Sequence, residues 1–455
     1  MTPNPTTRPL AGLDAPTAAS DRPRHRDSVR LARAALTRLI EPGDETALTV
    51  IDVLGAEHAL VVLTGRCRPT GEEEDALAEA CGAGGDSWRR RFAAGLRRWG
   101  TRSTTLAPER DLVAMHRLGG GLLVPEDAAW PSCLDDLGHR RPIALWTRGT
   151  GVLPEQARTL AVVGSREATP YGRAVTGQVV APLAAEGVTV LSGGAYGIDG
   201  HAHRVALEAG HGRPPTVAVL AGGLDRFYPA GHEDLLRAVM DQGLLLSEMP
   251  PGASPTRHRF LHRNRLIAGL AVGVLVVEAR WRSGAQNTAS HALGLGRELG
   301  VVPGPITSPS SAGCHRLLMD TPARLVTDVD GVRELLGARG SSGPLPSAHG
   351  PAATPSRPSA HGAAPVGGRQ ARPEDALSEQ ELLVFDALPV RAHATLDRLT
   401  VAAGMPVPML LPVLQRLARA GLAEERDRRW RRGSRAAARR AGSAGAGTEE
   451  STMKG

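Results

Sequence analysis

The sequence predicts an α/β protein whose core is a parallel sheet, with a helical domain before the core and a winged-helix-like domain after it. From residue 159 to about residue 337, short runs of β-branched apolar residues alternate with helical stretches, which is typical of βαβ units. Apolar residues recur at helical spacing from Val29 to about Leu118. Three short helical patterns and a basic extension lie between 376 and 433, which is the outline of a winged helix and also of a three-helix bundle.

The composition of the 455-residue chain argues against several classes of protein. Its four cysteines lie far apart and form no C-x-x-C pair, so we expect a reducing compartment and no metal site. We find no apolar run that approaches the roughly 20 residues needed to cross a bilayer, and the N-terminus lacks the pattern of a signal peptide. We therefore expect a cytoplasmic protein of roughly two to four domains.

The composition changes sharply along the chain and so marks the expected segments. Residues 343–373 are dominated by Gly, Pro, Ala and Ser, which cannot bury enough apolar surface to order themselves. Residues 425–440 hold eight Arg against two acidic residues, so most of the net charge of +7 lies there. We expect a disordered tail at 1–28, a helical domain at 29–118, a connector at 119–157, the core at 158–337, a flexible linker at 338–375, a winged-helix-like domain at 376–433 and a disordered basic tail at 434–455.

The core is predicted to be an extended Rossmann-like fold, in which helices separate the strands of a parallel sheet. The expected strands are 160–163, 188–191, 217–220, 244–247, 272–277 and a last one near 301–302. Ligands of such sheets bind beyond the carboxyl ends of the strands, so function is expected in the loops that follow them.

Two glycine-containing loops follow the first two strands of the core. The candidate residues are Gly164, Ser165 and Arg166 in the first loop, and Ser192, Gly193 and Gly194 in the second. Glycine lets the backbone approach a phosphate closely, while helix N-terminal amides and a guanidinium supply donors and positive charge. Neither loop reads G-x-G-x-x-G and the chain has no P-loop motif, so the usual marks of a dinucleotide site and of a nucleoside triphosphatase are missing. Glycine at a strand end can also be a simple turn requirement.

A basic cluster follows the fourth strand. Residues 257–265 hold four Arg, two His and no acidic residue, and the candidate binding residues are Arg257, Arg259, Phe260, Arg263, Asn264 and Arg265. Such a cluster suits contact with a nucleic-acid backbone, and its one aromatic ring could stack on a base. Charge runs are usually solvated helix faces, but this one is expected at the same sheet edge as the glycine loops. The loop 282–285, after the strand that ends at Glu278, adds Ser283 and Gly284 as donors.

Taken in order, these motifs resemble those of the DNA-processing A (DprA/Smf) family. The matching runs include Leu-Ala-Val-Val-Gly-Ser-Arg at 160–166, Leu-Ser-Gly-Gly-Ala-Tyr-Gly-Ile-Asp-Gly-His-Ala-His at 191–203, Arg-Asn-Arg-Leu-Ile-Ala-Gly-Leu at 263–270 and Val-Pro-Gly at 302–304. The resemblance spans about residues 120–337, and the regions on either side lie where this family often carries a sterile-alpha-motif-like domain and a winged helix. The chain departs from the family pattern at His232, Leu261 and Ala271, where Asn, Pro and Ser are usual.

The resemblance implies a homodimeric protein that binds and protects single-stranded DNA. It further implies that the protein loads the RecA recombinase past single-strand-binding protein, in DNA recombination or natural transformation, with no catalysis and no cofactor. By the same resemblance, Arg166, Arg259, Arg263 and Arg265 are expected to contact the DNA strand.

Two other functions stay open at this point. A nucleotide phosphoribohydrolase would share a Rossmann-like core and could use Glu278 or Asp199 as acid or base, but the P-G-G-x-G-T-x-x-E loop of that group is absent. A duplex-DNA-binding regulator is the second, and the Arg-rich strip at 426–440 favours it. Asp199, His201 and His203 have the look of a metal site, although capping and packing are the commoner roles for such residues at a helix start.

Overall fold

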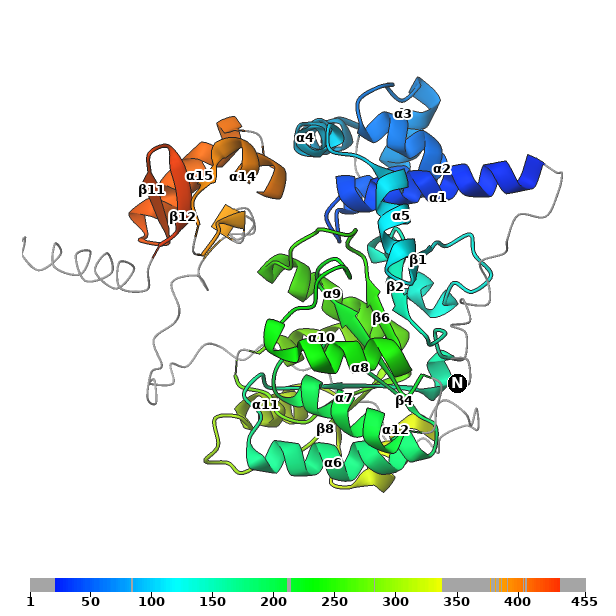
Figure 1. Cartoon of the computed structure of the whole chain (residues 1–455), viewed down its shortest axis with the longest axis vertical. Coiled ribbons are helices and arrows are strands. Elements are labelled where there is room, and N and C mark those ends of the chain that lie inside the picture. Colours follow the sequence, from blue (N-terminus) through cyan, green and yellow to red (C-terminus); the bar gives the residue numbers. More distant parts are fainter. Residues whose placement is uncertain are drawn as a thin grey trace, which may run out of the picture.

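The structure is a computed structural model that describes residues 21–82, 85–210, 214–281, 283–337 and, with short gaps, 377–433. Figure 1 shows a helical region (blue to cyan) stacked on one end of an α/β core (green to yellow), with a small C-terminal unit (orange to red) to one side. The expected linker at 338–375, the expected basic tail at 434–455 and Arg282 lie outside the described residues.

Five helices form the N-terminal region: α1 (Asp21–Leu39), α2 (Glu45–Leu63), α3 (Gly71–Ala80), α4 (Gly85–Ser103) and α5 (Pro108–Arg117). Buried side chains from the first four helices share one apolar core, among them Leu36, Val62, Leu77 and Trp88. The α1 helix already begins at Asp21, inside the segment expected to be a tail. The apolar spacing on which that expectation rested starts only at Val29, because the first turns of the helix are polar.

One helix among the described residues, α2, is long and apolar enough by length and composition to cross a membrane, with a mean hydropathy of 1.7. This differs from our expectation that no apolar stretch reaches that length. The structure uses α2 as a packing element, because half of its apolar window is buried inside the protein. The helix is also kinked at Gly55, where φ is 74° and the backbone leaves the helical conformation.

The core is one nine-stranded sheet with the strand order β1-β2-β6-β5-β4-β3-β7-β8-β9. The strands from β3 to β9 pair in parallel, whereas β1 and β2 add an antiparallel pair at the β6 edge. Their bounds are β1 (Gly120–Leu123), β2 (Leu145–Gly149), β3 (Thr159–Val163), β4 (Thr189–Ser192), β5 (Thr216–Leu220), β6 (Leu244–Ser247), β7 (Gly273–Val276), β8 (Glu298–Val301) and β9 (Arg324–Leu325). All six predicted strands are present with small shifts, and the mostly parallel α/β core is confirmed.

The segment expected to be a connector contributes two strands to this sheet. Strand β1 pairs with β2, and β2 pairs with β6, so the sheet continues beyond its parallel part. A 3₁₀ segment, η1 (Ser132–Arg140), lies between them, and a short one, η2 (Gln156–Arg158), leads into β3. Sequence pattern showed only one short extended piece here, because β1 contains Gly120 and Gly121 and has only four residues.

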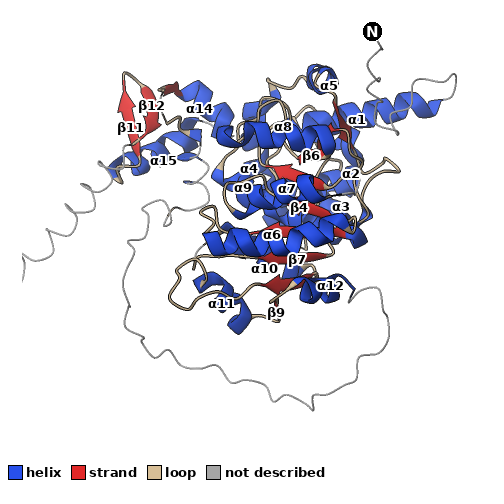
Figure 2. Cartoon of the chain, turned by 60° about the horizontal axis from the view of Figure 1, so that its bottom comes forward, coloured by secondary structure: helices blue, strands red, loops and turns tan. Residues whose placement is uncertain are grey.

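Helices cover both faces of the sheet (Figure 2). On one face α6 (Pro170–Ala185), α7 (Ile198–Ala209), α8 (Glu233–Gln242) and α12 (Val329–Gly337) pack on the strands. On the other face lie α9 (Arg257–Leu270), α10 (Gly284–Gly294) and α11 (Ala312–Asp320). A 3₁₀ turn, η3 (Ala230–His232), precedes α8. With both faces covered, the residues of β3 to β7 are buried, whereas those of the edge strand β9 are exposed.

The C-terminal unit combines α14 (Leu396–Ala403) and α15 (Val407–Arg419) with a three-stranded antiparallel sheet. Its strands are β10 (Ala394–Thr395), β11 (Ala423–Arg426) and β12 (Arg429–Arg432). The first of the three expected helices, at 379–388, lies only in part within the described residues. A winged helix would have this order of elements, and that identification stays a prediction. Pro412 lies inside α15, as the helical pattern at 409–420 indicated, and a proline within a helix costs helix stability.

Replacing Trp146 in β2 by Ala should destabilise the protein strongly. The Trp146 ring is fully buried, and its Nε1 donates a hydrogen bond to Thr37 Oγ1 of α1 at 3.2 Å, so it joins the sheet to the helical region. Removing a buried indole costs about 3–5 kcal/mol of the free energy of unfolding, which urea denaturation followed by circular dichroism measures. The control is Trp281→Ala, because that ring is 57% exposed and its loss should cost under about 0.5 kcal/mol. An equal loss in both variants would contradict the packing described here.

Candidate nucleic-acid interface

Five loops meet beyond the carboxyl ends of the parallel strands. They follow β3, β4, β5, β6 and β7, which are neighbours in the sheet and point the same way. The two glycine loops are the first two of these, and the basic cluster is the helix α9 that follows β6. The sheet therefore brings the sequence-predicted residues to one edge, as expected for ligand sites of parallel sheets.

An aromatic ring lies close to two guanidinium groups at this edge. The Phe260 ring has the guanidinium of Arg166 5.1 Å from its centre and that of Arg263 5.9 Å from it. Arg166 comes from the loop after β3 and is exposed, whereas Phe260 and Arg263 come from α9. Cations at this distance are attracted to the negative face of the ring. The edge thus offers positive charge and a partly exposed π-surface side by side.

A shallow pocket lies against the same ring. It is lined by Gly193, Leu220, Ala221, Gly222, Gly223, Arg226, Tyr228, Pro255 and Phe260. The rings of Tyr228 and Phe260 are 5.7 Å apart at their centres and inclined at 51°, and Tyr228 is half exposed. Two aromatic rings, a glycine pair and an exposed arginine suit a flat, anion-linked group such as a nucleotide base with its phosphate.

Carboxylates of the protein itself occupy the two glycine loops. The Glu278 carboxylate accepts hydrogen bonds from Thr169 N at 3.0 Å and from Thr169 Oγ1 at 2.5 Å, at the N-terminus of α6. The Asp199 carboxylate accepts the Gly193 amide at 3.2 Å. Burial raises the pKa of Asp199, although the charge of Arg263 and hydrogen bonds from the backbone amides of Gly164 and Gly193 act in the opposite direction. A phosphate from solution would have to displace these buried groups.

The glycine loops therefore differ from the anion cradles that their sequence suggested. The Ser192 hydroxyl donates to the Val162 carbonyl at 2.6 Å, and the Ser165 hydroxyl accepts from the Glu167 amide at 3.2 Å. Gly164 and Gly193 are required for close packing, since a Cβ on Gly193 would lie 2.5 Å from the Arg263 guanidinium. These residues and Gly194, which is buried, shape the edge from within, and Arg166 is the exposed one of the six candidate residues in the two loops.

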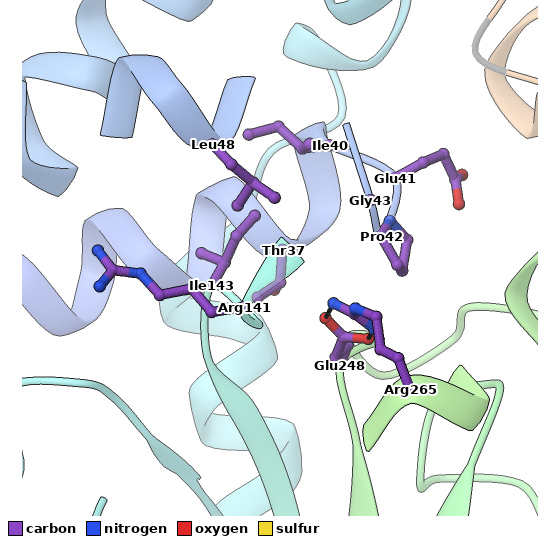
Figure 3. A pocket seen from close by; sticks show the side chains of 10 residues that line it. All are labelled: Thr37, Ile40, Glu41, Pro42, Gly43, Leu48, Arg141, Ile143, Glu248 and Arg265. Atoms are coloured by element: carbon purple, nitrogen blue, oxygen red, sulfur yellow. Dashed lines mark hydrogen bonds and ion pairs between the residues drawn. The ribbon is translucent and has the colours of Figure 1, made fainter. Parts of the chain in front are cut away.

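Arginines of the basic cluster are committed to partners inside the protein. Arg265 is 1% exposed and forms a two-pronged ion pair with Glu248 at 2.5 and 2.6 Å, which Figure 3 shows at the base of a small cleft below the α1–α2 turn. Arg259 binds Glu41 of the helical region at 2.7 and 2.9 Å. Arg263 donates to the Gly193 carbonyl at 2.8 Å and to the Val219 carbonyl. Arg257 is exposed.

These contacts change the roles expected for the cluster. Arg265 and Arg259 hold α9 in place and do not present free guanidinium groups to solvent. Burial lowers the pKa of Arg263 to about 10, so it keeps its charge at neutral pH and contributes a positive field from below the surface. Arg166 and Arg257 are exposed at this edge, and Phe260 is partly exposed.

The N-terminus of α10 completes the edge on its β7 side. Asn264 Nδ2 donates to the Gly284 carbonyl at 3.3 Å and to Asn287 Oδ1 at 3.1 Å, so it fastens α9 to the start of α10. The Ser283 hydroxyl is buried and has no hydrogen-bond partner among the described residues. Gly284 is exposed beside it. Asn264 thus has a structural role, and the Ser283 hydroxyl lies buried beside the start of α10.

The Asp-x-His-x-His pattern at 199–203 serves packing. His203 is fully buried with Nδ1 2.7 Å from Thr216 Oγ1, and His201 Nε2 lies 3.1 Å from the Arg173 carbonyl. In the part of the chain that the structure describes, no three His, Cys, Asp or Glu residues are grouped so as to hold a metal ion. The side chains of this pattern point to different partners, as expected for capping and packing.

Sequence reasoning missed three contributors to this edge. Tyr228 and Arg226 line the pocket, and their position after a predicted strand, close to a glycine pair, could have marked them. Glu41 lies more than two hundred residues before α9 in the chain and reaches it only through the fold, so no local pattern pointed to it.

Known proteins match the chain across the core and beyond it. Residues 121–337 match a family model described as DNA recombination-mediator protein A. A Mycobacterium tuberculosis protein named putative DNA processing protein DprA is 46% identical over 335 residues, which cover 70% of this chain and 79% of that protein. The solved structure of DNA processing protein A from Streptococcus pneumoniae has a TM-score of 0.50 and 27% identity, covering 67% of this chain and 96% of that one. A Helicobacter pylori structure, described as showing a single-stranded DNA binding mode, has a TM-score of 0.42 and 27% identity, covering 48% and 96%.

Replacing His203 by Gln should flatten the dependence of stability on pH. Burial lowers the pKa of His203 to about 3 from its ordinary 6.5, so between these values the unfolded chain binds a proton that the folded protein does not. Stability must therefore fall as pH falls below 6.5. Between pH 7.5 and 5.5 the wild type should lose about 1 kcal/mol more of its unfolding free energy than the variant, measured by urea denaturation at each pH. The exposed His116→Gln is the control, and parallel pH curves for wild type and His203→Gln would rule out a neutral buried His203.

Proposed function

Because this chain belongs to the DprA/Smf family of DNA processing proteins, we propose that it binds single-stranded DNA along the carboxyl edge of its sheet. A role in DNA processing and recombination belongs to the family as a whole. Single-strand binding at this edge is supported by the geometry of Phe260 and its neighbours.

The observation that carries the proposal is the Phe260 ring close to both the exposed Arg166 and the charged Arg263. An aromatic ring can stack only on a base whose face is free, and in a duplex each base face is covered by the next base pair. A guanidinium next to the ring can form an ion pair with the phosphate of the same nucleotide. This arrangement favours an unpaired strand over a duplex.

We propose that the edge binds DNA without catalysing a reaction. The carboxylates near it are engaged: Glu278 with Thr169, Glu248 with Arg265, and Asp199 with the Gly193 amide. A general acid or base needs access to its substrate, and these three groups are buried in the protein. This argues against the phosphoribohydrolase alternative, which needs a working carboxylate.

The duplex-DNA regulator finds less support in the C-terminal unit. Arg431 pairs with Glu424 at 2.5 Å, and the guanidinium of Arg432 lies 4.5 Å from the centre of the Phe385 ring. The exposed arginines of the β11–β12 hairpin stand next to the exposed acids Glu425 and Asp427, which reduce its net charge. The basic residues beyond 433 lie outside the described part of the chain.

We further propose, from the family resemblance, that the bound strand is handed to the RecA recombinase in place of single-strand-binding protein. A homodimer in the cytoplasm is part of the same proposal. The family description as a recombination mediator supports this step. The segment boundaries expected from the sequence, including the winged helix, are proposals as well.

Replacing Arg166 or Phe260 by Ala should weaken binding to a single-stranded oligonucleotide by about tenfold each, since stacking and one phosphate contact are each worth about 1–3 kcal/mol. Arg166→Ala should also lower the slope of log affinity against log salt by about one, whereas Phe260→Ala should leave the slope unchanged. Fluorescence anisotropy with labelled oligo-dT, repeated at several salt concentrations, measures both quantities.

Arg158→Ala is the matched control, because Arg158 is an exposed arginine that precedes β3 and so lies at the amino end of the sheet. It should bind like the wild type. A duplex of equal length should bind more weakly than the single strand. Unchanged affinity in both edge variants, or equal affinity for duplex and single strand, would remove this edge as the binding site.

A further inference from the structure

The turn between α1 and α2 packs directly on α9, the helix that carries Phe260. Glu41 in this turn binds Arg259 of α9. Two residues later, Gly43 has a φ of +82° and no room for a side chain, since a Cβ there would lie 2.4 Å from the His262 ring. Arg259 and His262 are three residues apart and therefore lie on one face of α9. The helical region thus contacts the helix at two successive points.

Glu41 joins three elements through one carboxylate. Arg259 donates to it from α9, with Nε at 2.9 Å from Oε2 and Nη2 at 2.7 Å from Oε1, and Arg102 donates from the end of α4 at 2.6 Å. The side chains of Glu41, Arg259 and Arg102 are only 16%, 11% and 8% exposed. Arg259 Nη1 also donates to the Ser254 carbonyl in the loop before α9. The first turn of α9 is therefore held from two sides.

Glu41, Arg259 and Arg102 form a cluster in which the two guanidinium groups strongly stabilise the charged carboxylate. Burial alone would raise the pKa of Glu41, but the charges and hydrogen bonds of Arg259 and Arg102 more than offset this and hold the pKa well below its ordinary value. The carboxylate is ionised at any working pH. Without it, two guanidinium groups would remain close together in a poorly hydrated site, where they repel each other.

Two neighbouring faces of α9 contact different parts of the protein because of its helical geometry. Successive residues of a helix point about 100° apart, so Phe260 and Arg263 form a face next to that of Arg259 and His262. The first face meets Arg166 and the glycine loops. The second face meets the α1–α2 turn. Any shift of α9 on the side of the turn moves the Phe260 ring relative to Arg166.

We propose that Glu41 is a positioning residue of the nucleic-acid interface, and that through it the N-terminal helical region sets where Phe260 stands. This inference rests on the proposed function of the sheet edge and gives the helical region a role in it. Figure 3 shows the turn that carries Glu41 above the Glu248–Arg265 pair. The contact between Glu41 and Arg259 therefore lies next to the buried ion pair that anchors the later turn of α9.

The sign of one mutational effect separates positioning from simple electrostatics. Glu41→Gln removes a negative charge near a site for a polyanion, so charge alone predicts tighter DNA binding. Loss of positioning predicts weaker binding, because Phe260 and Arg263 are no longer held against Arg166. We expect Glu41→Gln to raise the dissociation constant for oligo-dT about tenfold, the size of effect expected from losing one stacked base.

Asp44→Asn is the control for lost stability. Asp44 is also a shielded carboxylate in this turn, bound by Arg98 at 2.6 Å and by Trp99 Nε1 at 2.9 Å, but these partners all belong to the helical region. Asp44→Asn should therefore lower the thermal midpoint of the protein and leave the affinity for oligo-dT within about twofold of wild type. The thermal midpoint and circular dichroism of each variant establish that it is folded at the temperature of the binding assay.

Gly43→Ala tests the packing of the α1–α2 turn on α9 without changing any charge. It should weaken oligo-dT binding because the new methyl group pushes against His262. Gly65→Ala is matched to it, since Gly65 has a φ of +74° in the same region and open space around its Cβ position. Both variants carry the same backbone strain, so only Gly43→Ala should alter binding.

A double-mutant cycle with Phe260→Ala completes the test. If Glu41 acts through the ring, Glu41→Gln should have little further effect once the ring is gone, whereas additive losses would indicate a merely structural role. Wild-type or tighter binding by a folded Glu41→Gln variant, while Phe260→Ala weakens binding, would overturn this inference alone. If Phe260→Ala itself leaves binding unchanged, both this inference and the proposed function fail.

Discussion

A charged group that leaves water must find a partner inside the protein, and this constraint governs α9 and everything around it. The helix enters the core with guanidinium groups that cannot stay unpaired. Glu248 meets Arg265, the Gly193 and Val219 carbonyls meet Arg263, and Glu41 meets Arg259. Each pairing joins different parts of the chain to the helix: the loop after β6, the loop after β4 together with strand β5, and the helical region. The position of the sheet edge relative to the rest of the chain follows from these pairings.

The same constraint decides which groups are left to meet a ligand. Asp199 and Glu278 fill the two glycine loops, so the edge has no empty cradle for an isolated phosphate. The groups that remain at the surface are a ring, a neighbouring guanidinium and a shallow pocket between Tyr228 and Phe260. These suit repeated weak contacts along a flexible strand better than tight capture of a single nucleotide. Family membership and geometry therefore point in the same direction, the first toward DNA processing and the second toward an unpaired strand.

The strands and their order in the chain could be predicted because each is a short apolar run between helical stretches. The sheet edge that gathers the loops could be predicted as well, since parallel strands present their carboxyl ends together. The contacts that the arginines of α9 make could not be predicted from the sequence. Residues 257–265 contain no acidic residue, which indicated an open basic surface, yet the carboxylates that meet Arg259 and Arg265 come from Glu41 and Glu248. The antiparallel strands β1 and β2 were also missed as sheet members, because short glycine-containing strands carry little periodicity.

The sequence by itself determined the α/β class, the family and the set of residues that face one edge, because periodicity and motif order are local properties of the chain. Only the tertiary structure decided which of those residues stay free. Charge pairing depends on distances of a few ångströms between groups that are far apart in sequence, and no local pattern encodes such distances. Arg166 and Arg265 look alike in the sequence, but one lies exposed beside Phe260 and the other is buried against Glu248. That difference in burial separates a residue that solvent can reach from one that holds the protein together.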